Sequence, residues 1–235
     1  QYQKQNKENI FLQSLKEPME KYSWEDVYLN INKLSEEISQ HIKKGDRCLL
    51  VSENRPEWMI SDLSIMLSGG VTVPAYTTYT ERDYEYIIND CTPAIIIISD
   101  KIQYDKIKNI ISKKEFIKKI IFFENVENIN KKLNLKIDDI FQKKNYINKN
   151  FYDLKIQRKD MACIIYTSGT QGNPKGVMLS HGGILNNCEG AYGLLKTFIS
   201  RQPKFLTWLP LSHSYEHTVQ FVQIVVGARV FYAES

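Results

Sequence analysis

Residues 166–176 read Tyr-Thr-Ser-Gly-Thr-Gln-Gly-Asn-Pro-Lys-Gly. Apolar runs at residues 161–165 and 177–179 flank this stretch, so the sequence predicts a loop between two strands. Glycine lets backbone N–H groups turn toward a ligand, hydroxyl groups add hydrogen-bond donors, and the lysine adds a mobile positive charge. This combination of residues suits the binding of a polyphosphate.

Helices and strands alternate on both sides of this loop. Strands are expected at residues 46–52, 71–75, 94–98, 119–123 and 205–209 and from residue 228, and helices at 24–42, 57–67, 81–91, 101–111, 183–195 and 219–226. The expected strands are apolar on both faces, which is typical of parallel strands covered by helices. The fold class is therefore α/β, with parallel-rich sheets flanked by helices. Ligands bind such sheets at the carboxyl ends of strands, where the loop at 166–176 is expected.

The composition is that of a soluble globular protein, with 43% hydrophobic and 25% charged residues among 235. No apolar run is long enough to cross a membrane, and no signal peptide is visible. The first residue is Gln1, and the chain is expected to be a fragment at one or both ends. Four widely spaced cysteines without a C-x-x-C pair predict buried free thiols and a reducing, cytoplasmic compartment.

Positive charge is concentrated in one segment of the chain. Residues 101–160 hold 16 Lys and Arg against 8 Asp and Glu, whereas the whole chain has a net charge of +4. A solvated surface is the simplest interpretation, and a weak peripheral attraction to anionic lipid headgroups is the alternative. Nucleic acid is not an expected partner, because no aromatic pattern or motif supports it.

The spacing of the loop excludes two common phosphate-binding classes. A Walker loop requires G-x-x-x-x-G-K-[ST], but here Gly176 follows Lys175, and the dinucleotide pattern G-x-G-x-x-G is absent. A plain glycine-rich turn would account for the glycines and the proline. It would not account for a lysine accompanied by three hydroxyl residues.

Residues 166–176 resemble the phosphate-binding signature of the adenylate-forming, or AMP-binding, ligases. This superfamily includes acyl-CoA synthetases, luciferases and the adenylation domains of peptide synthetases, and only Gln171 departs from the usual threonine. Residues 209–217, Leu-Pro-Leu-Ser-His-Ser-Tyr-Glu-His, are similar to the next motif of the superfamily, in the form found in long-chain fatty acyl-CoA synthetases. Residues 45–47, 54–58 and 70–76 resemble the N-terminal domain of acyl-CoA synthetases.

The resemblance implies a two-step ligation of a fatty acid, with ATP, Mg²⁺ and coenzyme A. It assigns catalytic positions to Lys175 and His213 and places Thr167 nearest the Mg²⁺. The implied phosphate-binding residues are Thr167, Ser168, Gly169, Thr170, Gln171, Gly172 and Lys175. The implied acyl-pocket residues are His213, Tyr215, Glu216 and His217. Glu216 is as well explained by a structural salt bridge as by a catalytic role.

Two other interpretations of residues 209–217 have less support. His213 and His217 have the i, i+4 spacing of a metal pair, but no third ligand or H-E-x-x-H pattern accompanies them. Ser212 and His213 suggest a nucleophile and its base, but adjacent residues rarely face each other in the required way.

The resemblance also implies that residues 1–235 form only the N-terminal part of an adenylation domain. The adenosine-binding segments, a Mg²⁺-binding glutamate and a C-terminal domain would then lie beyond Ser235, and the isolated chain is expected to have little ligase activity. Two alternatives stay open. One is an adenylating enzyme for a shorter acyl, aryl or amino acid, and the other is a catalytically silent nucleotide- or acyl-binding module. Lys175 and the hydroxyl residues argue against the silent module.

Overall fold

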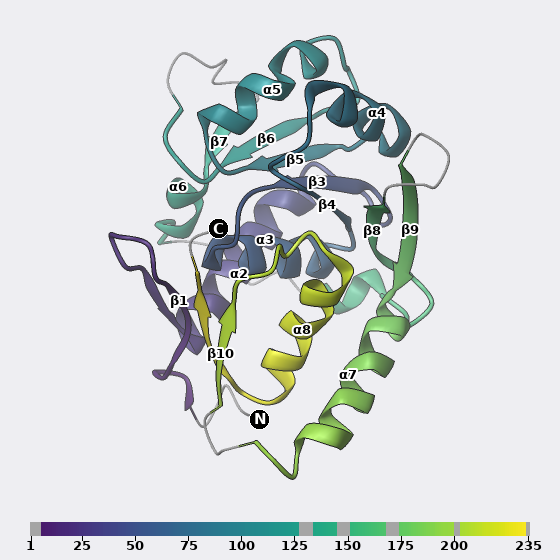
Figure 1. The fold of residues 1–235 in the computed structure, drawn as a ribbon. Helices are drawn as coiled ribbons and strands as arrows, with labels where there is room; N and C mark the ends of the chain where they lie inside the picture. The colour runs from purple at the N-terminus through teal and green to yellow at the C-terminus, as the bar shows by residue number, and fades with distance from the viewer. Residues whose placement is uncertain (1–5, 127–133, 145–150, 168–173, 200–202, 234–235) are drawn as a thin grey trace.

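The computed structural model describes residues 6–126, 134–144, 151–167, 174–199 and 203–233. These residues form two β-sheets, one of seven strands and one of four, with helices packed around them (Figure 1). Among the described strands, every pairing is parallel except β1 with β2 and β8 with β9. The predicted fold class, α/β with parallel-rich sheets, is confirmed.

The seven-stranded sheet has the strand order β7-β6-β5-β3-β4-β8-β9. Its strands are β3 (Arg47–Val51), β4 (Val71–Ala75), β5 (Ile95–Ile98), β6 (Lys119–Phe122), β7 (Asn134–Lys136), β8 (Met161–Thr167) and β9 (Lys175–Ser180). The chain runs from β3 to β4 and then crosses back over β3 to β5, so the winding direction changes between β3 and β5. Such a switch leaves a crevice outside the carboxyl ends of the two strands.

Helices cover both faces of this sheet. They are α2 (Trp24–Ser39), α3 (Pro56–Leu67), α4 (Glu81–Cys91) and α5 (Lys101–Ile111). Ile95 and Ile97 pack in a core with side chains of α2 and α3, whereas Ile96 and Ile98 pack with those of α4 and α5. Because successive side chains of a strand point to opposite faces, β5 must be apolar at every position. This explains why the predicted strand is an unbroken run of isoleucine.

The four-stranded sheet has the order β10-β11-β1-β2. Its strands are β1 (Ile10–Ser14), β2 (Lys21–Ser23), β10 (Lys204–Thr207) and β11 (Arg229–Tyr232). β1 pairs in parallel with β11, with Leu12 opposite Val230, although more than 200 residues separate them. The sequence did not predict β1 or β2, because both are short and their pairing depends on a partner at the other end of the chain.

Four further helical segments complete the described fold. They are α6 (Ile137–Phe141), a 3₁₀ helix (Phe151–Leu154), α7 (His181–Leu195) and α8 (Ser214–Val225). Helices α7 and α8 pack against β8, where Ile184 and Val222 share a core with Ile165. This packing places the first turn of α8 beside the strand that leads into the loop at 166–176.

Two helices begin at capping residues. Ser23 and Asp26 form a reciprocal capping box at the start of α2, and Ser180 accepts the N–H of Gly183 at the start of α7. The predicted start of the last helix at residue 219 is wrong, since α8 begins at Ser214. The first turn of α8 buries polar side chains, so its buried face lacks the apolar periodicity that predicts a helix. Strand β10 likewise ends at Thr207, two residues before the predicted end.

All four cysteines are free and buried, as the sequence predicts. Burial raises the pKa of the Cys91 thiol to about 12, so this thiol is neutral and unreactive at physiological pH. Among the described helices, none combines the length and the hydrophobicity needed to span a bilayer.

Candidate active site

The predicted phosphate-binding loop connects β8 to β9, which pair antiparallel. Thr167 and Lys175 are cross-strand partners at the loop end of this hairpin, and both residues are exposed. A hydroxyl group and an ammonium group therefore lie together where the loop begins and ends. The other predicted phosphate-binding residues fall outside the described residues: Ser168, Gly169, Thr170, Gln171 and Gly172.

Tyr166 supports the base of this loop. Its buried hydroxyl donates to the carboxylate of Asp90 at 2.5 Å, and its carbonyl accepts a hydrogen bond from the Tyr79 hydroxyl at 3.4 Å. Burial and the bond to Asp90 raise the pKa of Tyr166, so its phenol remains a donor at neutral pH. Opposite Tyr166, a Cβ on Gly176 would lie 2.8 Å from Cγ2 of Ile164, so the close approach of the strands requires glycine here. These contacts hold the end of β8 where the loop begins.

His213 is the N-cap residue of α8 and is exposed. Its Nδ1 atom accepts the backbone N–H of Tyr215 at 3.2 Å. When one ring nitrogen of a neutral imidazole accepts a hydrogen bond, the other carries the proton. The helix cap therefore selects the tautomer in which Nε2–H is available as a donor to a ligand. Tyr215, the neighbouring predicted pocket residue, is also exposed.

His217 and Glu216 lie on the buried side of the same turn. The Nε2 atom of His217 is 2.7 Å from Oδ2 of Asp62 in α3, and both side chains are almost completely buried. Burial lowers the pKa of His217, but the charge of Asp62 outweighs this effect and raises the pKa to about 10. Glu216 is also buried, which raises the pKa of its carboxyl group, while a hydrogen bond from Thr207 opposes this rise. The structure thus separates the four predicted pocket residues into an exposed pair and a buried pair.

The first turn of α8 also contacts the strand of the phosphate-binding loop. His217 interacts with Cys163 of β8, and Val222 shares a core with the same cysteine. His213 follows a strand of the four-stranded sheet, whereas Thr167 ends a strand of the seven-stranded sheet. The tertiary structure therefore places the second motif against the strand that leads into the loop, although the two motifs follow different sheets.

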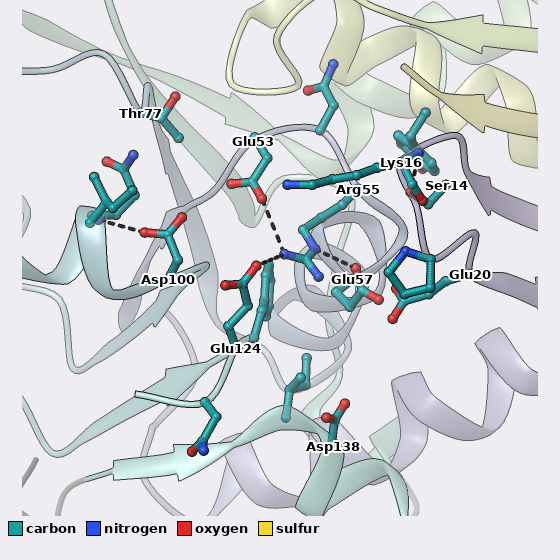
Figure 2. A pocket seen from close by; sticks show the side chains of 18 of the residues that line it. Ser14, Lys16, Glu20, Glu53, Arg55, Glu57, Thr77, Asp100, Glu124 and Asp138 are labelled. Atoms are coloured by element: carbon teal, nitrogen blue, oxygen red, sulfur yellow. Dashed lines mark hydrogen bonds and ion pairs between the residues drawn. The ribbon is translucent and has the colours of Figure 1, made fainter. Parts of the chain in front are cut away.

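The described residues also form a cleft of about 810 Å³, lined by residues from both sheets (Figure 2). Arg55, which follows β3, and Asp100, which follows β5, line it, so it lies at the switch in winding direction. None of the predicted site residues that the structure describes lines this cleft. The rule that ligands bind where the winding direction changes would therefore have predicted a site at this cleft and not at the β8–β9 loop.

Arg55 is the centre of the wall of this cleft. Its guanidinium nitrogens lie 2.8 Å from Glu57, 3.3 Å from Glu53 and 3.3 Å from Glu124 (Figure 2). The same group lies over the ring of Phe123, with 5.3 Å between the guanidinium carbon and the ring centroid. The three glutamates neutralise the charge of Arg55. The guanidinium group therefore stabilises the wall of the cleft and is not free to bind an anion.

A family comparison supplies the decisive observation. The family model described as "AMP-binding enzyme" matches residues 1–235.

This chain belongs to the AMP-binding enzyme family.

The relatives of this AMP-binding enzyme chain include long-chain synthetases. It is 30% identical over 224 residues to long chain acyl-CoA synthetase 4 of Arabidopsis thaliana, covering 89% of this chain and 33% of the relative. It is 29% identical over 219 residues to fatty acyl-CoA synthetase A of Dictyostelium discoideum, covering 88% and 32%. The chain thus spans about a third of the length of these curated relatives.

A solved structure supports the same fold. The O-succinylbenzoate coenzyme A synthetase of Bacillus subtilis, in complex with AMP, matches with a TM-score of 0.72 at 19% sequence identity. The match covers 99% of this chain and 54% of that chain. The predicted resemblance to the AMP-binding family is confirmed.

Among the described residues, no three His, Cys, Asp or Glu side chains lie close enough together to hold a metal ion. The bond between His217 and Asp62 argues against a zinc site shared with His213. Thr167 presents one exposed hydroxyl oxygen, which suits Mg²⁺ because this ion takes few protein ligands and completes its shell with phosphate and water. The predicted contact of Thr167 with Mg²⁺ stays a prediction.

Sequence reasoning missed two residues that organise this site. Asp62 holds the buried side of α8, and Asn54 hydrogen-bonds to the segment before it. Asn54 belongs to the stretch at 54–58 that carries part of the family resemblance, but nothing in its spacing points to residues 209–211. Both contacts link segments about 155 residues apart, which only the folded chain brings together.

Proposed function

We propose that this chain is the N-terminal part of the adenylation domain of an ATP-dependent long-chain fatty acid–CoA ligase. On this proposal, the rest of that domain and a C-terminal domain belong to other segments of the complete protein. The observation that carries the proposal is the pairing of Thr167 with Lys175 where the loop begins and ends, on a hairpin whose strand β8 packs against the helix that His213 caps. The name of the Arabidopsis thaliana relative supports the long-chain substrate class.

The proposed reaction has two steps. A carboxylate oxygen of the fatty acid attacks the α-phosphorus of ATP, and the bond from that phosphorus to the bridging oxygen breaks. Acyl-adenylate forms, and pyrophosphate leaves with the electron pair. The sulfur of coenzyme A then attacks the acyl carbon, the thiol proton is released, and AMP leaves.

The loop residues would act on the leaving pyrophosphate. Adenylation requires stabilisation of the charge that accumulates on the β- and γ-phosphates, together with in-line positioning of the reactants. Lys175 would donate a charge-assisted hydrogen bond to these phosphates, and backbone N–H groups of the loop would add further donors. Mg²⁺ would supply further charge neutralisation between the phosphates when bound near the hydroxyl of Thr167.

His213 would act on the other reactant. Its Nε2–H is available as a donor because Nδ1 is engaged by the backbone of Tyr215. We assign this donor to an oxygen of the carboxylate or of the α-phosphate, and Tyr215 to the entrance of the acyl pocket. The side chains of Glu216 and His217 are buried on the other side of this turn, and they would stabilise the conformation of the pocket.

The proposed setting of the complete protein is the cytoplasm. The excess of basic residues at 101–160 supports a weak peripheral attraction to anionic membrane surfaces. Vesicle sedimentation with and without anionic lipid tests this, and binding that persists at high salt would contradict an electrostatic attraction.

Carboxylate-dependent exchange of pyrophosphate into ATP, measured with the complete protein, tests the proposed function. Palmitate and similar acids are expected to stimulate the exchange. Stimulation by only short acyl, aryl or amino acids would move the assignment to another adenylating enzyme. Absence of exchange with every acid would favour a silent binding module.

The contribution of Lys175 is tested in the same assay with Lys175→Ala. Loss of one charge-assisted hydrogen bond of about 1.5–3 kcal/mol predicts roughly a 10- to 100-fold lower exchange rate. Lys113→Ala is the control, since this exposed lysine lies between α5 and β6, and three strands separate β6 from β8 in the sheet. A Lys175→Ala variant with the wild-type rate would remove the loop from the mechanism.

A further inference from the structure

The carboxamide of Asn54 forms two hydrogen bonds to one short segment of backbone. Its Nδ2 donates to the carbonyl oxygen of Leu209 at 2.7 Å, and its Oδ1 accepts the N–H of Leu211 at 2.9 Å. Asn54 and Leu211 are both buried. The donor on one side and the acceptor on the other fix the orientation of the amide and hold Pro210 between them. An asparagine side chain thus replaces the strand partner that this segment lacks after β10.

Asn54 is held on a rigid base. It follows β3 and precedes Arg55, whose guanidinium bonds to Glu53, Glu57 and Glu124 (Figure 2). Pro56 is the first residue of α3, and its ring restricts the backbone of Arg55 before it. Because the residues on both sides of Asn54 are fixed, its carboxamide provides a fixed reference point on the seven-stranded sheet.

The segment that Asn54 holds determines where α8 begins. The carbonyl of Pro210 accepts the N–H of His213 at 2.9 Å, and the carbonyl of His213 accepts the N–H of His217 at 3.0 Å. A chain of short contacts therefore connects Asn54 to the N-cap of α8 and to the imidazole of His213. Displacement of Leu209 or Leu211 would move this imidazole relative to Thr167 at the end of β8.

We infer that Asn54 is a positioning residue for adenylation, which sets the place of His213 relative to the phosphate-binding loop. This inference rests on the proposed function. Asn54 touches neither reactant in this scheme and acts through the backbone at Leu209 and Leu211. It links the two sheets, because Asn54 follows β3 and residues 209–211 follow β10.

Hydrogen exchange of the complete protein tests the local part of this inference without activity. In Asn54→Ala, the backbone amides of Leu211, Ser212 and His213 are expected to exchange roughly tenfold faster, since a typical hydrogen bond has about that effect on an equilibrium. The matched control is Asn32→Ala, because Asn32 is equally buried but donates only to Tyr28 within its own helix. Unchanged exchange in Asn54→Ala would overturn the inference.

Asn54→Asp separates the two hydrogen bonds and is available if Asn54→Ala fails to fold. The carboxylate still accepts the N–H of Leu211 but has no donor for the carbonyl of Leu209. Its second oxygen faces that carbonyl and is repelled by it. The amide of Leu211 is therefore expected to stay more protected than in Asn54→Ala, while the first-step rate falls at least as far. A wild-type rate in Asn54→Asp would contradict the positioning effect.

Steady-state exchange kinetics of the complete protein test the link to catalysis. We expect kcat of Asn54→Ala to fall at least tenfold, with the KM for ATP within twofold of wild type. The segment that Asn54 holds follows the four-stranded sheet, whereas the phosphate-binding loop belongs to the seven-stranded sheet. If Asn54→Ala only destabilised the protein, kcat would fall in proportion to the unfolded fraction. The loss would then be small at low temperature and would grow as the temperature rises. Wild-type kcat in Asn54→Ala overturns the inference, whereas an inactive wild-type protein overturns the proposed function as well.

Discussion

His217 and Asp62 form an ion pair that the surrounding side chains exclude from water. Gln220 donates a second hydrogen bond to the same oxygen of Asp62 at 3.1 Å, and the ring of Trp58 meets that of His217 edge to face. Two charges are tolerated in this core because each is the principal partner of the other. At the scale of single residues, this pair fixes the helix that carries His213.

His217→Ala is expected to destabilise the chain by about 3–5 kcal/mol at pH 7, because it leaves Asp62 buried without a cation. Replacement of both partners, His217→Gln with Asp62→Asn, is expected to cost less than His217→Ala alone. Urea unfolding at 25 °C measures these differences. His41→Ala is the control, since His41 pairs with Glu37 at a partly exposed site where pairs contribute about 0–1 kcal/mol.

The raised pKa of His217 also predicts a pH dependence. The folded chain retains this proton to about pH 10, whereas the unfolded chain releases it near pH 6.5. The contribution of His217 is therefore complete below pH 6.5 and is lost as the pH rises toward 10. The free energy of unfolding of wild type should fall across this window relative to that of His217→Gln. Parallel curves for the two proteins would contradict a charged pair.

At the scale of elements, the start of α7 depends on a close approach between helix and turn. The N–H of Gly182 donates to the carbonyl of Arg158 at 2.6 Å, in the segment that leads into β8. A Cβ on Gly182 would lie 2.8 Å from that carbonyl oxygen, and backbone has little freedom to move away. On Gly183, the nearest atom to a Cβ would be Oγ of Ser180 at 3.5 Å, an ordinary contact.

Two adjacent glycine substitutions therefore have opposite expected effects. Gly182→Ala should destabilise the chain by about 1–3 kcal/mol through the steric conflict with Arg158. Gly183→Ala should be neutral or stabilise it by up to about 1 kcal/mol, because alanine is the better helix former. Chemical denaturation of the two variants beside wild type measures the contrast. Equal stabilities would show that the helix and the turn separate easily.

At the scale of the whole molecule, the hairpin of β1 and β2 packs against the seven-stranded unit through a charged network. The hydroxyl of Tyr22 donates to Glu57 at 2.7 Å, and Glu57 also pairs with Arg55. Partial burial and a hydrogen bond to Glu57 raise the pKa of Glu20 to about 7, although this residue remains exposed to water. Although burial opposes it, the charge of Arg55 lowers the pKa of Glu57, so the shared proton resides on Glu20.

This network predicts that stability decreases as the pH rises from about 4.5 to 7. In that window the folded chain holds a proton on Glu20 that the unfolded chain releases. Unfolding of Glu20→Gln should release up to about one proton fewer than unfolding of wild type in this pH window. The variant should therefore be more stable than wild type at pH 8. Glu17→Gln, an exposed position of the same hairpin, is the control. Unfolding curves measured at pH 5, 6, 7 and 8 test this, and an unchanged slope in Glu20→Gln would contradict the shared proton.

Much of the seven-stranded sheet was predictable because its signals are local. The apolar run at β5 and the capping residue Ser23 each predict an element from neighbouring residues alone. The start of α8 was not predictable, since the polar face of its first turn is stabilised by Asp62 in another helix. The strand β1 was missed for the same reason, because its pairing partner β11 lies at the far end of the chain.

The sequence by itself determined the α/β class, the loop at 166–176 and the family, because spacing along the chain carries that information. Only the tertiary structure decided which motif residues face outward, with His213 exposed and His217 buried against Asp62. It alone also showed that Asn54 holds the segment at residues 209–211. The physical reason is that burial and hydrogen bonding depend on partners about 155 residues away, and local sequence does not record which partner the fold brings close.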